Sequence, residues 1–336
     1  MPVNRRITVA SLLCTALPSL PLWAQETTAA VTDETWVDAA RQREVPVKLR
    51  WPDASVHPGQ RPLVLFSHGL GGTREGGAVW GEAWAAAGFV VLHLQHAGSD
   101  LAALRGVASS FTDKSALRPV GSATQLLARL RDVGFALDEV GRHQASNRGR
   151  WGSVRAGRAG LCGHSFGAMT TLGMAGQRYP NFDGINEPRL ASFIALSPSP
   201  PPSGNVTQAF ERMTRPLLSV TGTLDGDVAG TGATPERRAA VFASLPSSKP
   251  SGVPPGNKAH LVLQDADHMT FAGQTDRDVE IVPREAITRD LQGGHHALVA
   301  TVTTDWWRAT LLDGAAARSQ LRTPANLRAG DLWQQK

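Results

Sequence analysis

One serine stands in a pattern that could make it a nucleophile. Ser165 is the centre of Gly163-His164-Ser165-Phe166-Gly167, a Gly-x-Ser-x-Gly pattern. An apolar, strand-like run precedes it and a helical segment rich in small residues follows. In that setting the serine occupies a sharp turn between a strand and a helix, and its hydroxyl projects above the sheet. The flanking glycines let the two elements approach closely, and the pattern therefore predicts nucleophilic chemistry at Ser165.

A serine hydroxyl needs a general base to become an effective nucleophile. His268 ends the apolar run "KAHLVLQDADH", and Asp225 and Asp227 end the run "RPLLSVTGTLDGD". Serine, acid and histidine in this chain order are one known arrangement of a catalytic triad. We expect His268 to be the base and Asp225 to orient its imidazole, because Asp225 is nearer to the strand end. Asp227 remains the alternative acid.

A glycine-rich turn supplies a second candidate feature. "SHGLGG" (67–72) follows the apolar, strand-like run "LVLF" (63–66). Attack on a carbonyl creates a negatively charged oxygen, which needs two N–H donors. We expect these donors to be the backbone N–H groups of Leu70 and Phe166. His68 and His164 are interpreted as structural histidines.

These candidates require a particular set of elements. A hairpin is expected over 36–51. Strands are expected at 63–69, 89–96, 159–165, 191–199, 215–225 and 258–268, with helices at 78–88, 121–141 and 296–312. Apolar strands that alternate with helices predict an α/β fold with a mainly parallel sheet and helices on both faces. The candidate residues follow separate strands, at the edge where ligands gather in such sheets. We expect a single catalytic domain over 33–325, an irregular connection at 97–120 that could cover the site, and a frayed polar end.

The first 24 residues predict export. Arg5 and Arg6 precede an apolar run that ends at Ala24, with prolines in its second half. This pattern is typical of a cleaved signal peptide (1–24), and a membrane anchor is the alternative. We therefore expect a secreted or periplasmic protein that is not an integral membrane protein. Cleavage would leave Cys162 as the remaining cysteine, which excludes an internal disulfide and favours a buried thiol.

Composition excludes several other classes. Charged residues make up 19% and hydrophobic residues 41%, which argues against a disordered chain. The net charge of +5 comes from scattered arginines, whereas nucleic-acid binding needs a clustered basic face. The densest basic stretch, 142–158, is interpreted as a solvated loop. His295 and His296 have no zinc-like partners nearby and are interpreted as a surface pair, so no metal is expected.

Four segments carry a resemblance to a known family. "LVLFSHGLGGTREGG", "GFVVLHLQHAGSD", "GHSFGAMTT" and "DADHMTF" resemble the α/β-hydrolase branch of platelet-activating-factor acetylhydrolase-like and bacterial dienelactone-hydrolase-like esterases. The resemblance covers about residues 36–315. It implies an α/β-hydrolase fold, a triad of Ser165, Asp225 and His268, and oxyanion donors at Leu70 and Phe166. Dienelactone hydrolases use a cysteine at the serine position, so their substrate is not expected.

Together these features predict a serine carboxylic ester hydrolase that works through an acyl-enzyme. Short-chain acyl esters, as small or lipid-like molecules, are the expected substrates because no long apolar lid segment is visible. No cofactor is expected. A peptidase or amide hydrolase with the same triad, and a non-catalytic binding protein of this fold, are the alternatives.

Overall fold

The chain is organised around one large sheet. A computed structural model describes residues 29–107, 114–146, 149–201, 203–247, 257–274 and 282–336. The expected signal peptide (1–24) lies outside the described residues. The sheet has nine strands in the order β1-β2-β4-β3-β5-β6-β7-β8-β9. Their bounds are β1 Ala30–Asp38, β2 Arg43–Trp51, β3 Arg61–Ser67, β4 Val90–Leu94, β5 Val154–His164, β6 Leu190–Leu196, β7 Leu217–Leu224, β8 Lys258–Asp267 and β9 Leu332–Gln335.

The sheet is mainly parallel, as predicted. The strands from β4 through β3, β5, β6 and β7 to β8 pair in parallel. The β1–β2 hairpin joins one edge antiparallel to β4, and β9 joins β8 antiparallel at the other edge. The carboxyl ends of β3, β5, β7 and β8 therefore meet along one edge of the sheet.

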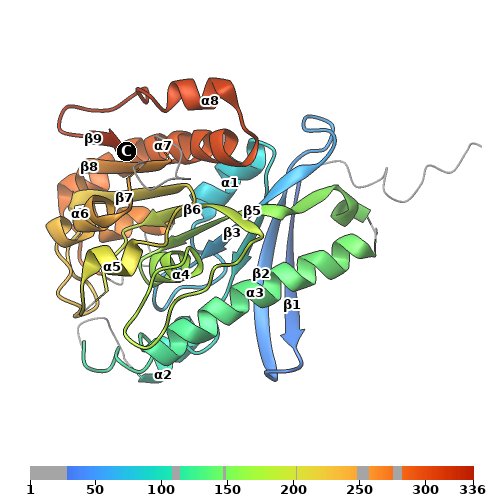
Figure 1. Cartoon of the computed structure of the whole chain (residues 1–336), viewed down its shortest axis with the longest axis horizontal. Coiled ribbons are helices and arrows are strands. Elements are labelled where there is room, and N and C mark those ends of the chain that lie inside the picture. The colour runs from blue at the N-terminus through green and yellow to red at the C-terminus, as the bar shows by residue number, and fades with distance from the viewer. Residues whose placement is uncertain (1–28, 108–113, 147–148, 202, 248–256, 275–281) are drawn as a thin grey trace, which may run out of the picture.

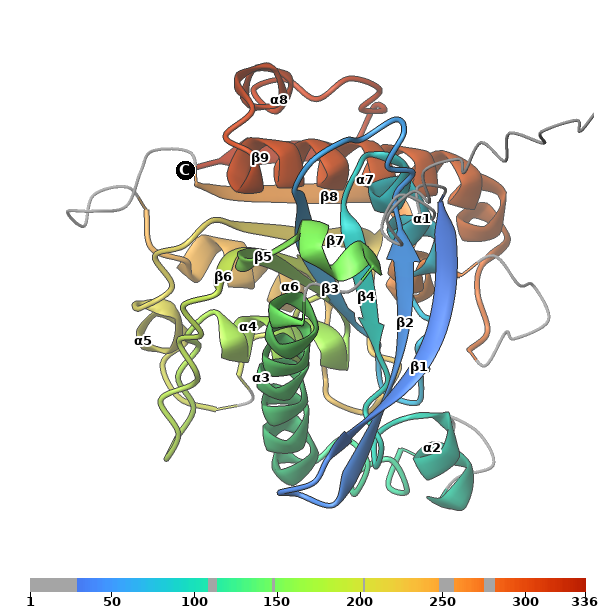
Figure 2. The ribbon, with the colours of Figure 1, turned by 90° about the vertical axis from the view of Figure 1, so that its right-hand side faces the viewer.

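Helices cover both faces of the sheet (Figures 1 and 2). Their bounds are α1 Ala78–Ala86, α2 Leu101–Val107, α3 Ala123–Ala145, α4 Phe166–Met174, α5 Val206–Phe210, α6 Pro235–Ser244, α7 Ala286–Leu311 and α8 Ala315–Gln320. Helices α1 and α7 pack on one face, and α3, α4 and α6 on the other. Two short 3-10 turns, η2 Gly149–Ser153 and η3 His268–Ala272, complete the described elements.

Each face of the sheet has its own apolar core. All seven residues of β3 are buried, and alternate side chains enter opposite cores. Leu63 and Leu65 join the core under α3 and α4, whereas Val64 and Phe66 join the core under α1 and α7. Burial on both faces explains why the central strands read as continuous apolar runs.

The C-terminal segment is ordered into the sheet, so one prediction was wrong. The end after residue 325 was expected to be frayed, but β9 pairs with β8 from Ala259 to Val262. The backbone of Lys336 also exchanges two hydrogen bonds with that of Lys258, at 3.2 and 3.0 Å. The sheet thus extends past both ends of the expected 33–325 range, since β1 begins at Ala30.

Two further interpretations were wrong. The stretch 142–158 is not a loop throughout, because α3 continues to Ala145 and β5 begins at Val154. His295 and His296 are not a surface pair, since both are buried in α7. Their Nε2 atoms lie 2.9 Å from Gln264 O and 3.0 Å from Thr270 O, so they anchor α7 to the end of β8 and to η3.

Candidate active site

The turn between β5 and α4 has the geometry that the glycine pattern predicts. Ser165 adopts φ 55° and ψ −114°, a conformation that non-glycine residues rarely take. A Cβ on Gly163 would lie 2.1 Å from Gly167 O, and one on Gly167 would lie 1.9 Å from Ser67 O. Strand and helix can therefore approach this closely only with glycine at both positions. The result is a serine held at a strained turn at the start of a helix.

His268 reaches Ser165 from the end of β8. Its Nε2 lies 2.9 Å from Ser165 Oγ, and its Nδ1 lies 2.8 Å from Asp225 Oδ1. A capping box between Asp267 and Thr270 fixes the turn that begins at His268. The loops after β5, β7 and β8 thus bring hydroxyl, imidazole and carboxylate within hydrogen-bonding reach of one another, as predicted.

Asp225 lies in a fully buried, donor-rich environment. Ser197 Oγ donates to Asp225 Oδ1 at 2.8 Å, and Thr221 Oγ1 donates to Oδ2 at 2.8 Å. Arg238 Nε lies 2.8 Å from Oδ1. Burial alone would raise the pKa of Asp225, but His268, Arg238 and Ser197 outweigh it and lower the pKa. The carboxylate therefore stays ionised beside the imidazole.

Asp227 has a different environment. Its carboxylate accepts hydrogen bonds from the backbone N–H groups of Ala229, Thr231 and Gly232, at 2.9 to 3.0 Å. It stabilises the turn after β7, and within the described residues its carboxylate forms no hydrogen bond with His268. The geometry therefore favours Asp225 over Asp227 as the partner of His268.

Two residues of this site have no signal in the sequence. Ser197 follows β6 at φ 55°, and its Oγ lies 2.7 Å from His268 Nδ1 as well as against Asp225. Arg238 of α6 donates to the carbonyls of Ser197 and Gly226, both at 3.0 Å, and to Asp225 O at 2.9 Å. Both come from elements that sequence motifs do not connect to the serine turn.

An apolar pocket opens at Ser165 and His268. Its volume is about 350 Å³. Apolar side chains make up much of its lining: Leu70, Leu101, Val228, Ala229, Met269 and Val282. Leu101 belongs to the 97–120 connection, so part of that segment borders the site. The connection is not irregular throughout, because it contains the helix α2.

Of the two expected N–H donors, Leu70 lines this pocket and Phe166 follows the lining residue Ser165. Phe166 is the first residue of α4, and the first N–H groups of a helix have no partner within the helix. Leu70 lines the pocket in the turn after β3, where the neighbouring Gly71 N–H donates to Ser99 O at 3.0 Å. The structure therefore places Leu70 in the lining of the pocket and Phe166 directly after the lining residue Ser165. Their role as oxyanion donors remains a prediction.

The remaining histidines near the site are buried and structural in their contacts. His68 Nε2 accepts from the His96 N–H at 3.0 Å, and its Nδ1 lies 2.6 Å from Gly69 O. His164 Nε2 lies 3.0 Å from His268 O. Burial holds the pKa of His68 well below its ordinary value and lowers the pKa of His164 to about 3. These two rings are neutral, and their nitrogens contact backbone groups, whereas His268 Nε2 faces Ser165 Oγ.

The mainly parallel sheet, with Ser165 on the turn after β5 and His268 after β8, has the α/β-hydrolase fold. The family model for platelet-activating factor acetylhydrolase, isoform II, matches residues 38–119. That segment contains Leu70 but ends before Ser165. Among solved structures, a ferulic acid esterase from Streptomyces cinnamoneus is similar with a TM-score of 0.55 and 18% sequence identity. The similarity covers 86% of this chain and 91% of that one.

No curated protein matches the chain. By fold the chain is an α/β-hydrolase, and the family match supports a carboxylic ester hydrolase. In the described part of the chain, His, Cys, Asp and Glu side chains form no group of three that could hold a metal ion. Among the described helices, none combines the length and apolar character that a membrane span needs.

Proposed function

We propose that the chain is a serine carboxylic ester hydrolase that works through an acyl-enzyme at Ser165. Ser165 Oγ attacks the ester carbonyl carbon while His268 Nε2 accepts the hydroxyl proton. The C–O bond to the alcohol then breaks, and His268 returns the proton to the leaving oxygen. Water attacks the acyl-enzyme by the same route, which releases the acid and restores Ser165.

The remaining site residues act on charge. Asp225 holds the His268 imidazole in the tautomer with Nδ1 protonated and stabilises the imidazolium that forms. The N–H groups of Leu70 and Phe166 bind the oxyanion of the tetrahedral intermediate. The observation that carries the proposal is the continuous contact from Ser165 through His268 to Asp225 at the mouth of an apolar pocket.

The pocket supports short acyl esters as substrates. A cavity of about 350 Å³ with apolar walls suits a small acyl or aromatic group. The two comparisons add candidate substrates by their names: the acetyl ester of platelet-activating factor and an ester of ferulic acid. Both acyl groups are compact enough to be included in a first substrate panel.

A nucleophile test separates this function from a non-catalytic role. Ser165→Ala should lower kcat on p-nitrophenyl acetate at least 1,000-fold, on the order of the loss seen when a triad nucleophile is removed. It should also abolish labelling by a fluorophosphonate probe. Ser203→Ala, which changes an exposed serine, is the matched control and should keep both. Wild-type turnover by Ser165→Ala would refute the proposal.

A substrate panel resolves the finer assignment. Acetate, butyrate, octanoate and palmitate esters, a ferulate ester and an acetanilide should be compared by kcat/KM. We expect the acetate and butyrate esters to lead and the amide to be far slower. A preference for the palmitate ester would contradict the short-chain assignment, and comparable turnover of the amide would favour an amide hydrolase.

We further propose that residues 1–24 direct export and are then removed. The support is sequence alone, Arg5 and Arg6 before the apolar run to Ala24. Mass spectrometry of the protein recovered from the periplasm or medium should find an N-terminus at Gln25. An intact N-terminus on a membrane-bound protein would favour the anchor.

A further inference from the structure

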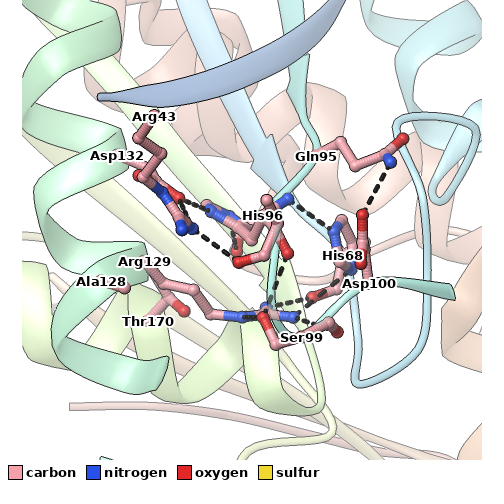
Figure 3. Close-up of polar contacts among 12 residues, drawn as sticks. Arg43, His68, Gln95, His96, Ser99, Asp100, Ala128, Arg129, Asp132 and Thr170 are labelled. Atoms are coloured by element: carbon pink, nitrogen blue, oxygen red, sulfur yellow. Dashed lines mark hydrogen bonds and ion pairs between the residues drawn. The ribbon is translucent and has the colours of Figure 1, made fainter. Parts of the chain in front are cut away.

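A buried arginine lies directly behind the glycine-rich turn after β3. Arg129 projects from α3 and has no solvent exposure. Its Nη1 donates to His68 O at 2.6 Å, and its Nη2 donates to Gly69 O and Ser99 O, each at 3.3 Å. Its Nε donates to Ser99 Oγ at 2.8 Å. Figure 3 shows this guanidinium between α3 and the turns that carry His68 and Ser99.

The same guanidinium also contacts the other side of the oxyanion site. It stacks over the Phe166 ring with 4.3 Å between the guanidinium carbon and the ring centroid. Phe166 and Leu70 are the two residues whose N–H groups are proposed to bind the oxyanion. One side chain therefore touches the backbone next to the first donor and the side chain of the second.

The geometry of the peptide bond lets these contacts fix the direction of the Leu70 N–H. In a trans peptide the C=O and N–H groups point in opposite directions. The Gly69 carbonyl belongs to the same peptide as the Leu70 N–H, and it is drawn toward Arg129 Nη2 and His68 Nδ1. The Leu70 N–H must then point away from α3, toward the side where Leu70 and Ser165 line the pocket.

The charge of Arg129 has no carboxylate in direct contact among the described residues. The carboxylate of Asp132, one turn further along α3, instead contacts Arg43 Nε at 2.8 Å and His96 Nδ1 at 2.9 Å. Burial lowers the pKa of Arg129 to about 9, so the side chain remains a cation near neutral pH. Burial of a cation lowers the stability of the fold, and here the carbonyl oxygens of His68, Gly69 and Ser99 offset that loss.

We propose that Arg129 is a positioning residue for the oxyanion hole, which it holds by fixing the Gly69–Leu70 peptide and the Phe166 ring. This inference rests on the proposed ester hydrolase function. Arg129 would act on the stability of the transition state, because the oxyanion exists only after attack on the carbonyl. Loss of Arg129 should therefore lower kcat and leave KM nearly unchanged.

The test compares two arginines of matched chemistry. Arg215 also donates to backbone carbonyls, Glu187 O and Met174 O, and stacks at 4.8 Å over the Phe193 ring. It precedes β7 and therefore lies at the amino ends of the parallel strands, whereas Ser165 lies at their carboxyl ends. Arg129→Met and Arg215→Met should both lower the unfolding temperature, but Arg129→Met alone should lower kcat.

We expect kcat of Arg129→Met on p-nitrophenyl acetate to fall on the order of 100-fold, as for a misplaced catalytic group, with KM within about threefold. A trifluoromethyl ketone, whose hemiketal adduct with Ser165 carries an oxyanion, should bind more weakly by a similar factor. Arg129→Lys keeps the charge but loses the planar fork, and we expect an intermediate loss of both.

The outcomes separate the two proposals. If wild-type protein lacks Ser165-dependent turnover, the function fails and this inference fails with it. If wild-type protein is active and folded Arg129→Met or Arg129→Lys keeps its kcat and its affinity for the ketone, only the role of Arg129 is overturned. If Arg129→Met does not fold, Arg129→Lys decides alone, since wild-type kcat and ketone affinity in that variant overturn the role.

Discussion

Asp225 and Asp227 lie two residues apart after the same strand, yet their carboxylates have different partners. Asp225 is buried against His268, Ser197 and Thr221, whereas Asp227 accepts backbone N–H groups of its own turn. Nearness to the strand end and the Gly222-x-x-Asp spacing, the two sequence arguments for Asp225, separate them only weakly. The buried donors around Asp225 separate them clearly.

A pair of conservative substitutions tests this difference. Asp225→Asn keeps the shape but cannot hold His268 in the required tautomer, and kcat should fall about 10,000-fold. Asp227→Asn keeps one oxygen acceptor for the N–H groups of its turn and does not touch His268, so kcat should stay within about threefold of wild type. Both variants should be measured on p-nitrophenyl acetate at pH 8. An inactive Asp227→Asn beside an active Asp225→Asn would reverse the assignment.

At the scale of single elements, the serine turn depends on backbone contact. The site of a Cβ on Gly167 lies 1.9 Å from Ser67 O, so any side chain there must push α4 away from β3. Movement of α4 would shift Ser165 and Phe166 together, because both belong to the start of that helix. Stability and activity should therefore be lost together at this position.

Gly167→Ala should lower the free energy of unfolding by about 3 kcal/mol or more, at the upper end of the cost of overpacking. Gly134→Ala is the matched control, since Gly134 lies inside α3 with open space around its Cβ position. Replacing a mid-helix glycine by alanine should raise stability by about 0.5 to 1 kcal/mol. Urea unfolding of both variants measures the contrast. Equal stability of the two variants would show that the close approach is not required.

The elements themselves differed in how well the sequence predicted them. The central strands were predictable because burial on both faces makes their sequence apolar throughout, as in β3 and β6. Strand β9 was missed because its four residues "LWQQ" are mostly exposed, and only pairing with β8 makes them a strand. Helix α6 was missed although Thr234 caps it and Pro235 begins it, which is a readable signal.

The residues of the site also fall into those that the sequence predicted and those that it missed. Ser165, Asp225 and His268 each follow a strand, so their meeting at one sheet edge follows from topology that the sequence indicates. Ser197, Arg238 and Arg129 could not be found in this way. Each acts through contacts between elements distant in the chain, and no local pattern records such contacts.

At the scale of the whole molecule, three arginines each bind a different turn that carries residues of the site. Arg129 of α3 binds the turn after β3, and Arg238 of α6 binds the turns after β6 and β7. Arg284 binds Asp267, next to His268, with Nε to Oδ2 at 2.7 Å. Each guanidinium has several donors in a rigid fork and can therefore fix an irregular turn that lacks sheet or helix bonds of its own.

Buried histidines with a lowered pKa are a second feature of the whole molecule. They include His68, His93, His96, His164 and His260. Burial lowers their pKa values, to about 3 for His93 and His164 and to about 4 for His96 and His260. These rings stay neutral in the folded protein at a pH where the same rings in the unfolded chain begin to bind protons.

The sign of the resulting pH dependence follows directly. Between about pH 6.5 and pH 5 the unfolded state binds more protons than the folded state, so the free energy of unfolding falls as the pH falls. Each fully shifted histidine contributes up to about 1.4 kcal/mol per pH unit to this slope. Carboxylates such as Asp225, whose folded pKa is lowered, add their own loss only below about pH 4.

We therefore expect the stability to decrease by several kcal/mol, at least about 3, between pH 7 and pH 5.5. Urea unfolding at closely spaced pH values measures the slope. His260→Gln removes a ring that stacks 5.0 Å from Phe242 and contacts Ser219 O, away from the serine turn. This variant should be less stable at pH 7 but should show a shallower slope, by up to about 1.4 kcal/mol per pH unit. A flat profile in the wild type, or an unchanged slope in His260→Gln, would mean that these rings are already protonated in the folded protein.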